Sequence, residues 1–125
     1  MNIPPALKTW FIVHFVADYL AAVPLMIAPE LVLGLLQWGT VDPIATRIVA
    51  AAFMAIGGVS LIERNASLDV YRVMLKLKLI WSVSAMVGVL IATKGQFGLG
   101  STVVFLVFLG FFSVWAYYFR KVRVV

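Results

Sequence analysis

Two ionisable side chains interrupt a long apolar stretch near the N-terminus, and these are the residues best suited to chemistry in this sequence. His14 and Asp18 stand four residues apart within the run Trp10–Ile27. In a helix this spacing places them on one face, one turn apart. A carboxylate near mid-bilayer costs about 2.5–3.5 kcal/mol to insert, so we expect Asp18 to face protein or trapped water and to have a partner.

Two cations elsewhere in the chain are candidate partners for this carboxylate. Arg47 lies one turn inside the second apolar stretch, and Lys78 lies near the start of the third. At about 1.5 Å per residue, Asp18 lies about 16 Å into the membrane from the face where the first span begins, and Arg47 lies about 6 Å in from the opposite face. In a bilayer core of about 30 Å, this leaves a vertical gap of about 8 Å between the two residues. An arginine side chain bridges most of that gap. His14, Asp18, Arg47 and Lys78 therefore form the predicted buried polar site.

This site has a functional and a structural interpretation. In the functional one, the four side chains hold a polar headgroup or relay protons. In the structural one, Asp18 and Arg47 form a salt bridge that fastens the first membrane helix to the second and neutralises itself without a ligand. His14 would then be a core histidine bonded to Asp18 or to a backbone carbonyl. Both interpretations stay open at this point.

The composition places these residues in a membrane. The chain is 64% hydrophobic and only 12% charged, whereas soluble domains are about 45–50% apolar and 25% charged. Each helical crossing takes about 20 residues, so 125 residues allow four spans and no extramembrane domain. We predict an all-α polytopic membrane protein, a four-transmembrane-helix bundle forming one domain over 1–125. The predicted spans are about 7–27, 44–62, 73–93 and 102–119.

A short segment between the first two spans is predicted to lie at the interface. The stretch from Pro29 to Asp42 is too short to cross and too apolar for a solvated loop. Leu31, Leu35 and Trp38 recur there at helical spacing, and tryptophan favours the headgroup level. Asp42 followed by Pro43 is typical of a helix start, with aspartate as N-cap and proline at the first position.

Small residues and lysines indicate which helix faces point inward. Arg47 shares a face with Ala51, Ala55 and Gly58, a row that allows close helix packing, so this face is predicted to point inward. Lys76 is predicted to point toward lipid and Lys78 toward the interior. Ser84, Gly88 and Ala92 form a second small-residue row, suited to contact with a neighbouring helix.

Several classes of site are excluded by composition. The chain has no cysteine and a single histidine. The other possible metal ligands lie at opposite membrane surfaces: Glu30, Asp42, Glu63 and Asp69. We therefore predict no metal site and no cofactor. The net charge of +5 reflects membrane topology and not nucleic-acid binding, because no basic patch with interleaved aromatics is present. Eight basic residues fall on the side of the termini and two on the other, which predicts cytoplasmic N- and C-termini.

The layout of the chain resembles that of the small four-helix DoxX-like membrane proteins. The resemblance is carried by the run Pro29–Leu36, by Asp42-Pro43, Arg47, Ala51-Ala52 and Gly57-Gly58, and by the basic entry to the third span. Some members of that group are linked to quinone-dependent oxidoreductase complexes. The resemblance implies an accessory subunit or a lipophilic ligand such as a quinone, and it transfers no catalytic residue.

Three functions follow as hypotheses. The first is a non-catalytic accessory or stabilising subunit of a larger membrane complex, of a quinone-linked redox type, in a prokaryotic cytoplasmic membrane. The second is a binder or proton-coupled transporter of a small lipophilic ligand that uses His14, Asp18 and Arg47. An enzyme acting on a lipid is the least favoured, because no paired acid and base can be assigned. The expected partners are lipid, other membrane subunits or further copies of the chain.

Overall fold

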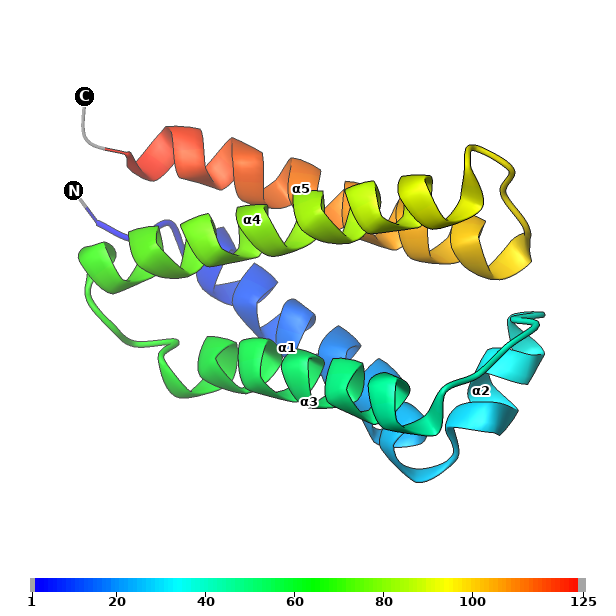
Figure 1. The fold of residues 1–125 in the computed structure, drawn as a ribbon. Helices are drawn as coiled ribbons and strands as arrows, with labels where there is room; N and C mark the ends of the chain where they lie inside the picture. The colour runs from blue at the N-terminus through cyan, green and yellow to red at the C-terminus, as the bar shows by residue number, and fades with distance from the viewer. Residues whose placement is uncertain (1, 124–125) are drawn as a thin grey trace. The chain divides into compact units, whose positions relative to one another are not determined.

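The computed structural model describes residues 2–123, and the regular secondary structure of that range is all helical. Four of its five helices are long and apolar enough to cross a membrane, which confirms the predicted all-α membrane fold (Figure 1). The helices are α1 (Pro5–Ile27), α2 (Pro29–Leu35), α3 (Pro43–Ile62), α4 (Leu68–Thr93) and α5 (Leu99–Val122). Residues 1 and 124–125 of the predicted 1–125 domain lie outside the described range.

The long helices extend beyond the predicted spans, most clearly at the ends of α4 and α5. α4 begins at Leu68 and not near 73, and α5 ends at Val122 and not near 119. These added turns carry Asp69, Arg72, Arg120 and Lys121. Hydropathy marks the part of a helix that suits hydrocarbon, whereas its polar turns continue into the headgroup layer. The sequence therefore located the membrane spans correctly and underestimated the lengths of the helices.

Proline and aspartate set the helix starts. Pro5, Pro29 and Pro43 each occupy the first turn of a helix, where the missing N–H is not needed. At α3 the Asp42 carboxylate accepts hydrogen bonds from the backbone N–H groups of Ile44 (2.8 Å) and Ala45 (3.0 Å). The predicted N-cap is confirmed.

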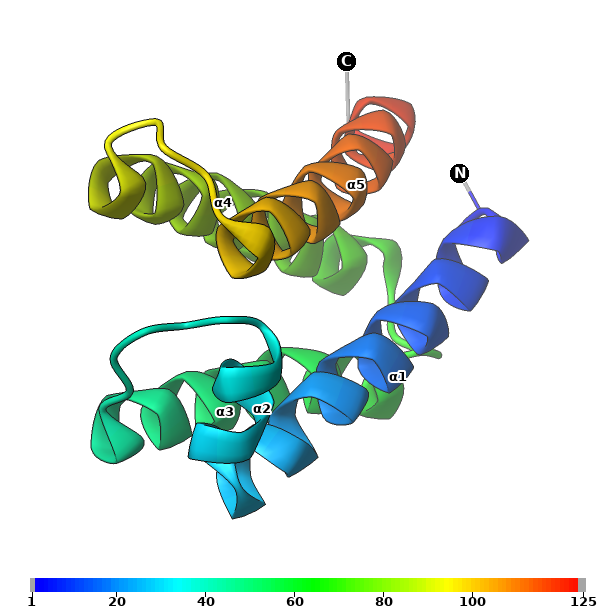
Figure 2. The same ribbon diagram turned by 90° about the vertical axis from the view of Figure 1, so that its right-hand side faces the viewer.

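The first compact unit, Pro4–Ala66, is a hairpin of α1 and α3, and the short α2 lies in the connection that joins them (Figures 1 and 2). The buried residues of α1 recur every three or four positions and so form one stripe: Leu7, Phe11, His14, Asp18 and Ala22. The two ionisable residues thus belong to the packed stripe of α1. On α2 and its C-terminal end, Leu31, Leu35 and Trp38 are exposed, as an interfacial segment requires.

The second compact unit, from Ser67 onward, is a hairpin of α4 and α5. The reversal between them uses left-handed backbone at Lys94 (φ 51°) and Gly95 (φ 80°), a conformation that favours glycine at the second position. Ser101 then supports the start of α5, because its hydroxyl oxygen accepts from the Gly98 N–H at 2.9 Å. The glycine-rich segment 94–101 therefore reverses the chain between the two helices.

The inward face of α3 differs from the prediction. Of the predicted inward row, Arg47, Ala51 and Ala55 are exposed, whereas Gly58 is half-buried. The buried positions are Ala50, Gly57 and Ser60. The buried face is thus rotated relative to the predicted row. Small residues permit close packing on either face, so their spacing alone does not determine which face is used.

Candidate functional site

The centre of the candidate site is the pair His14 and Asp18 on α1. The Nδ1 of His14 lies 3.3 Å from the Oδ2 of Asp18, and the residues are only 4% and 5% exposed. Their four-residue spacing produces this contact, because it stacks the two side chains on adjacent turns. The sequence predicted the burial, and this contact is one of the two partners that it left open for His14. A carboxylate and an imidazole this close can share a proton.

Gly57 on α3 makes room for this carboxylate. A Cβ at Gly57 would lie 2.7 Å from the Cβ of Asp18 and 2.9 Å from its Oδ2, closer than such atoms approach in proteins. The backbones of α1 and α3 therefore come together at the level of Asp18. Glycine in a helix interior costs about 1 kcal/mol relative to alanine, so its presence here has a packing reason.

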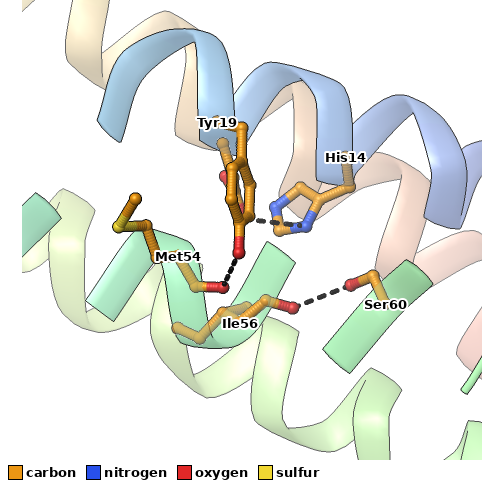
Figure 3. A network of polar contacts seen from close by, with 6 residues as sticks. His14, Tyr19, Met54, Ile56 and Ser60 are labelled. Carbon is orange, nitrogen blue, oxygen red and sulfur yellow. Dashed lines mark hydrogen bonds and ion pairs between the residues drawn. The ribbon is translucent and has the colours of Figure 1, made fainter. Parts of the chain in front are cut away.

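Tyr19 adds a second link between the same two helices. Its hydroxyl donates to the carbonyl of Met54 at 3.2 Å, and Figure 3 shows the ring reaching from α1 to α3 to make this bond. Gly58 lies beside that hydroxyl, since a Cβ there would stand 3.1 Å from the Tyr19 oxygen. Ser60 donates to the carbonyl of Ile56 at 2.8 Å within α3, as Figure 3 also shows.

Gly57 and Tyr19 were missing from the predicted site. The signal for Gly57 was present in the sequence, because two consecutive glycines inside an apolar helix are costly unless another element approaches closely. Tyr19 gave a weaker signal. Its position next to Asp18 indicated the region, whereas its partner is a backbone carbonyl that no sequence pattern marks.

Arg47 does not join this pair, which corrects the prediction of an Asp18–Arg47 salt bridge. Its Nε donates to the carbonyl of Met26 at 3.0 Å and its Nη1 to the carbonyl of Pro43 at 3.3 Å. Met26 lies in the last turn of α1, where carbonyls lack partners within the helix and a cation is favourable. Arg47 therefore caps the C-terminal end of α1.

The register of the hairpin explains why the salt bridge is not formed. α1 and α3 run in opposite directions, with Asp18 against Gly57 and Met26 against Arg47. Gly57 and Arg47 are ten residues apart, about 15 Å along the helix axis. The prediction measured depth from each membrane face separately, and it underestimated this offset.

Lys78 belongs to the α4–α5 unit, where it is only 2% exposed. Its Nζ stands 5.1 Å from the ring centroid of Trp115 on α5, within the range of a cation–π interaction. Lys76 is exposed. The predicted difference between these two lysines is therefore confirmed, and the aromatic ring opposite Lys78 is a feature that the sequence did not indicate.

Within residues 2–123 no group of three or more histidine, cysteine, aspartate or glutamate side chains comes together in a way that could hold a metal ion. The chemistry that His14 and Asp18 offer is proton binding and polar contact in an apolar setting.

No family model, curated protein or solved structure matches the chain. The resemblance to DoxX-like proteins thus stays a hypothesis drawn from sequence layout.

Proposed function

We propose that this integral membrane protein is a non-catalytic accessory or stabilising subunit of a larger membrane complex. The observation that supports this most is the small-residue row on α4. Ser84, Gly88 and Ala92 are exposed, and a Cβ at Gly88 would meet nothing within 4 Å. Lipid chains do not require small residues, whereas an approaching membrane helix does.

The class of complex follows from the sequence layout. The resemblance to DoxX-like proteins makes a quinone-linked redox complex the partner class that we propose. The short connections between helices also suit a subunit of this kind, because they leave little protein outside the membrane.

Purification from native membranes tests this function. Gly88→Leu fills the small-residue row, and Gly110→Leu is a matched control, because Gly110 is also exposed on a long helix with nothing within 4 Å. We expect the same partner proteins to copurify with the unmodified chain and with Gly110→Leu, and to be lost with Gly88→Leu. A monodisperse monomer without copurifying protein in several mild detergents would contradict the proposal.

A second candidate function is favoured by the buried pair. His14 and Asp18 lie in contact on α1 and are only 4% and 5% exposed. This arrangement suits a binder or proton-coupled transporter of a small lipophilic ligand. Arg47 is no longer part of that site.

Ligand binding at different pH values tests the second function. The probes are tetraphenylphosphonium, a lipophilic cation, and a short-chain ubiquinone analogue. We expect a pH-dependent affinity for one of them that is lost in Asp18→Asn and retained in Lys94→Gln, a change of an exposed turn residue. Equal binding by both variants would exclude Asp18 from the site.

We also propose cytoplasmic termini in a prokaryotic cytoplasmic membrane. Eight of the ten basic residues fall on the side of the termini when the four long helices cross in turn. Reporter fusions at Lys94 and at the C-terminus should give opposite signals. Matching signals would contradict this topology.

A further inference from the structure

We propose that the C-terminal face of α5 is a binding site for one anionic phospholipid. An open depression of about 650 Å³ lies on this face. It is lined by Phe112, Ser113, Ala116, Tyr117, Arg120 and Lys121. All six residues come from the last three turns of one helix, so the depression belongs to α5 alone.

The helical spacing arranges these residues as two parallel rows. Phe112, Ala116 and Arg120 recur at intervals of four, and Ser113, Tyr117 and Lys121 lie beside them at the same interval. The surface therefore changes along about 12 Å from apolar, through aromatic, to cationic. The buried residues Trp115, Tyr118 and Val122 point elsewhere, which leaves these rows exposed or half-buried.

The cationic end is free to bind an anion. Arg120 and Lys121 are exposed, and within residues 2–123 neither takes part in an ion pair. The Nζ of Lys121 stands 5.6 Å from the ring centroid of Tyr117, so it is held over that ring. Two full positive charges at this level attract a phosphate group.

The helix terminus itself works against an anion, but only weakly. A helix C-terminus carries about half a negative charge, less than the two cations provide. Arg72 on α4 reduces it further, because its Nε donates to the carbonyl of Val122 at 2.7 Å. The field at this end of α5 is therefore positive.

A phospholipid fits this surface better than a free phosphate ion. The Ser113 hydroxyl donates to the carbonyl of Leu109 at 2.8 Å, so the end of the depression away from Arg120 and Lys121 presents mainly apolar groups. Phe112 and Ala116 there suit an acyl chain, and Tyr117 suits the headgroup boundary. A free ion would use the cationic end alone, whereas an anionic phospholipid contacts the whole length.

Native mass spectrometry of the purified protein, released from micelles doped with either phosphatidylglycerol or phosphatidylcholine, tests this site. We expect preferential retention of one phosphatidylglycerol. Each surface cation strengthens the attraction to anionic lipid about five-fold, so Arg120→Gln combined with Lys121→Gln should weaken retention about 25-fold. The matched control combines Lys76→Gln with Lys94→Gln, which removes the same charge from two other exposed positions, and should retain the lipid.

Three results would overturn the proposal. The first is equal retention of the two lipids by the unmodified chain. The second is an equal loss in the two double variants, which would indicate net charge and not a site. The third is complete displacement of phosphatidylglycerol by millimolar inorganic phosphate, which would indicate a simple anion site. Retention of phosphatidylglycerol in the presence of that phosphate supports the lipid.

Discussion

The Cβ that Gly57 lacks would stand 2.7 Å from the Cβ of Asp18, so α3 approaches α1 closely at the carboxylate of α1. His14 contacts the same carboxylate from the preceding turn of α1. The polar pair thus contacts the backbone of the next span. The contact between Gly57 and Asp18 therefore affects both the packing of α1 against α3 and the surroundings of the Asp18 carboxylate.

Gly57→Ala is therefore expected to destabilise the protein by about 1–3 kcal/mol, the usual cost of overpacking. The clash involves the Asp18 Cβ, which cannot swing aside as a flexible side-chain end can. Unfolding in detergent measures the effect. Gly110→Ala is the control and should be neutral or mildly stabilising, because open space surrounds Gly110 and alanine favours helix. Equal stability of the two variants would contradict the close contact.

Arg47 and Asp18 are expected to behave as independent residues. In a double-mutant cycle of Arg47→Gln and Asp18→Asn, the coupling free energy should stay below about 0.5 kcal/mol, because each residue bonds to different groups. The comparison cycle pairs His14→Ala with Asp18→Asn and should show coupling of about 0.5–3 kcal/mol. Coupling of Arg47 to Asp18 as strong as that of His14 would restore the salt bridge predicted from sequence.

Lys78 and Lys76 provide a matched pair two residues apart. Lys78→Ala should lower the unfolding free energy by about 2 kcal/mol or more, since it removes a buried aliphatic stem and the cation beside Trp115. Lys76→Ala should change it by less than about 0.5 kcal/mol, because that side chain is exposed. Similar losses from the two substitutions would argue against the cation–π contact.

Arg72 is expected to stabilise the second hairpin through Val122 and not through Asp69. Arg72→Gln should cost about 1.5–3 kcal/mol, the range for a hydrogen bond from a charged donor, because it removes the bond to the end of α5. Asp69→Asn should cost less than about 1 kcal/mol, since the Asp69 side chain is 87% exposed and its ion pair with Arg72 is solvated. Thermal unfolding of the two variants ranks these contributions, and the reverse order would contradict this account.

Composition and periodicity determined much of the fold. Apolar runs of about 20 residues have few alternatives to membrane helices, so the four spans followed directly from the sequence. Local rules were reliable for the Asp42 N-cap, and they placed His14 and Asp18 on one face of a helix, because both depend on residues within four positions of each other. The different positions of Lys76 and Lys78 followed in the same way from their neighbours on the helix.

The tertiary structure decided what depends on how two helices align. The register of α1 against α3 places Gly57 at Asp18 and carries Arg47 to the carbonyl of Met26. The rotation of α3 exposes Ala51 and Ala55, and α5 brings Trp115 to Lys78. Apolar and small residues permit many registers and rotations at similar energy, so helical spacing alone does not select among them. The selection comes from steric fit and bonding between residues far apart in the chain, such as the carboxylate of Asp18 against the bare backbone of Gly57.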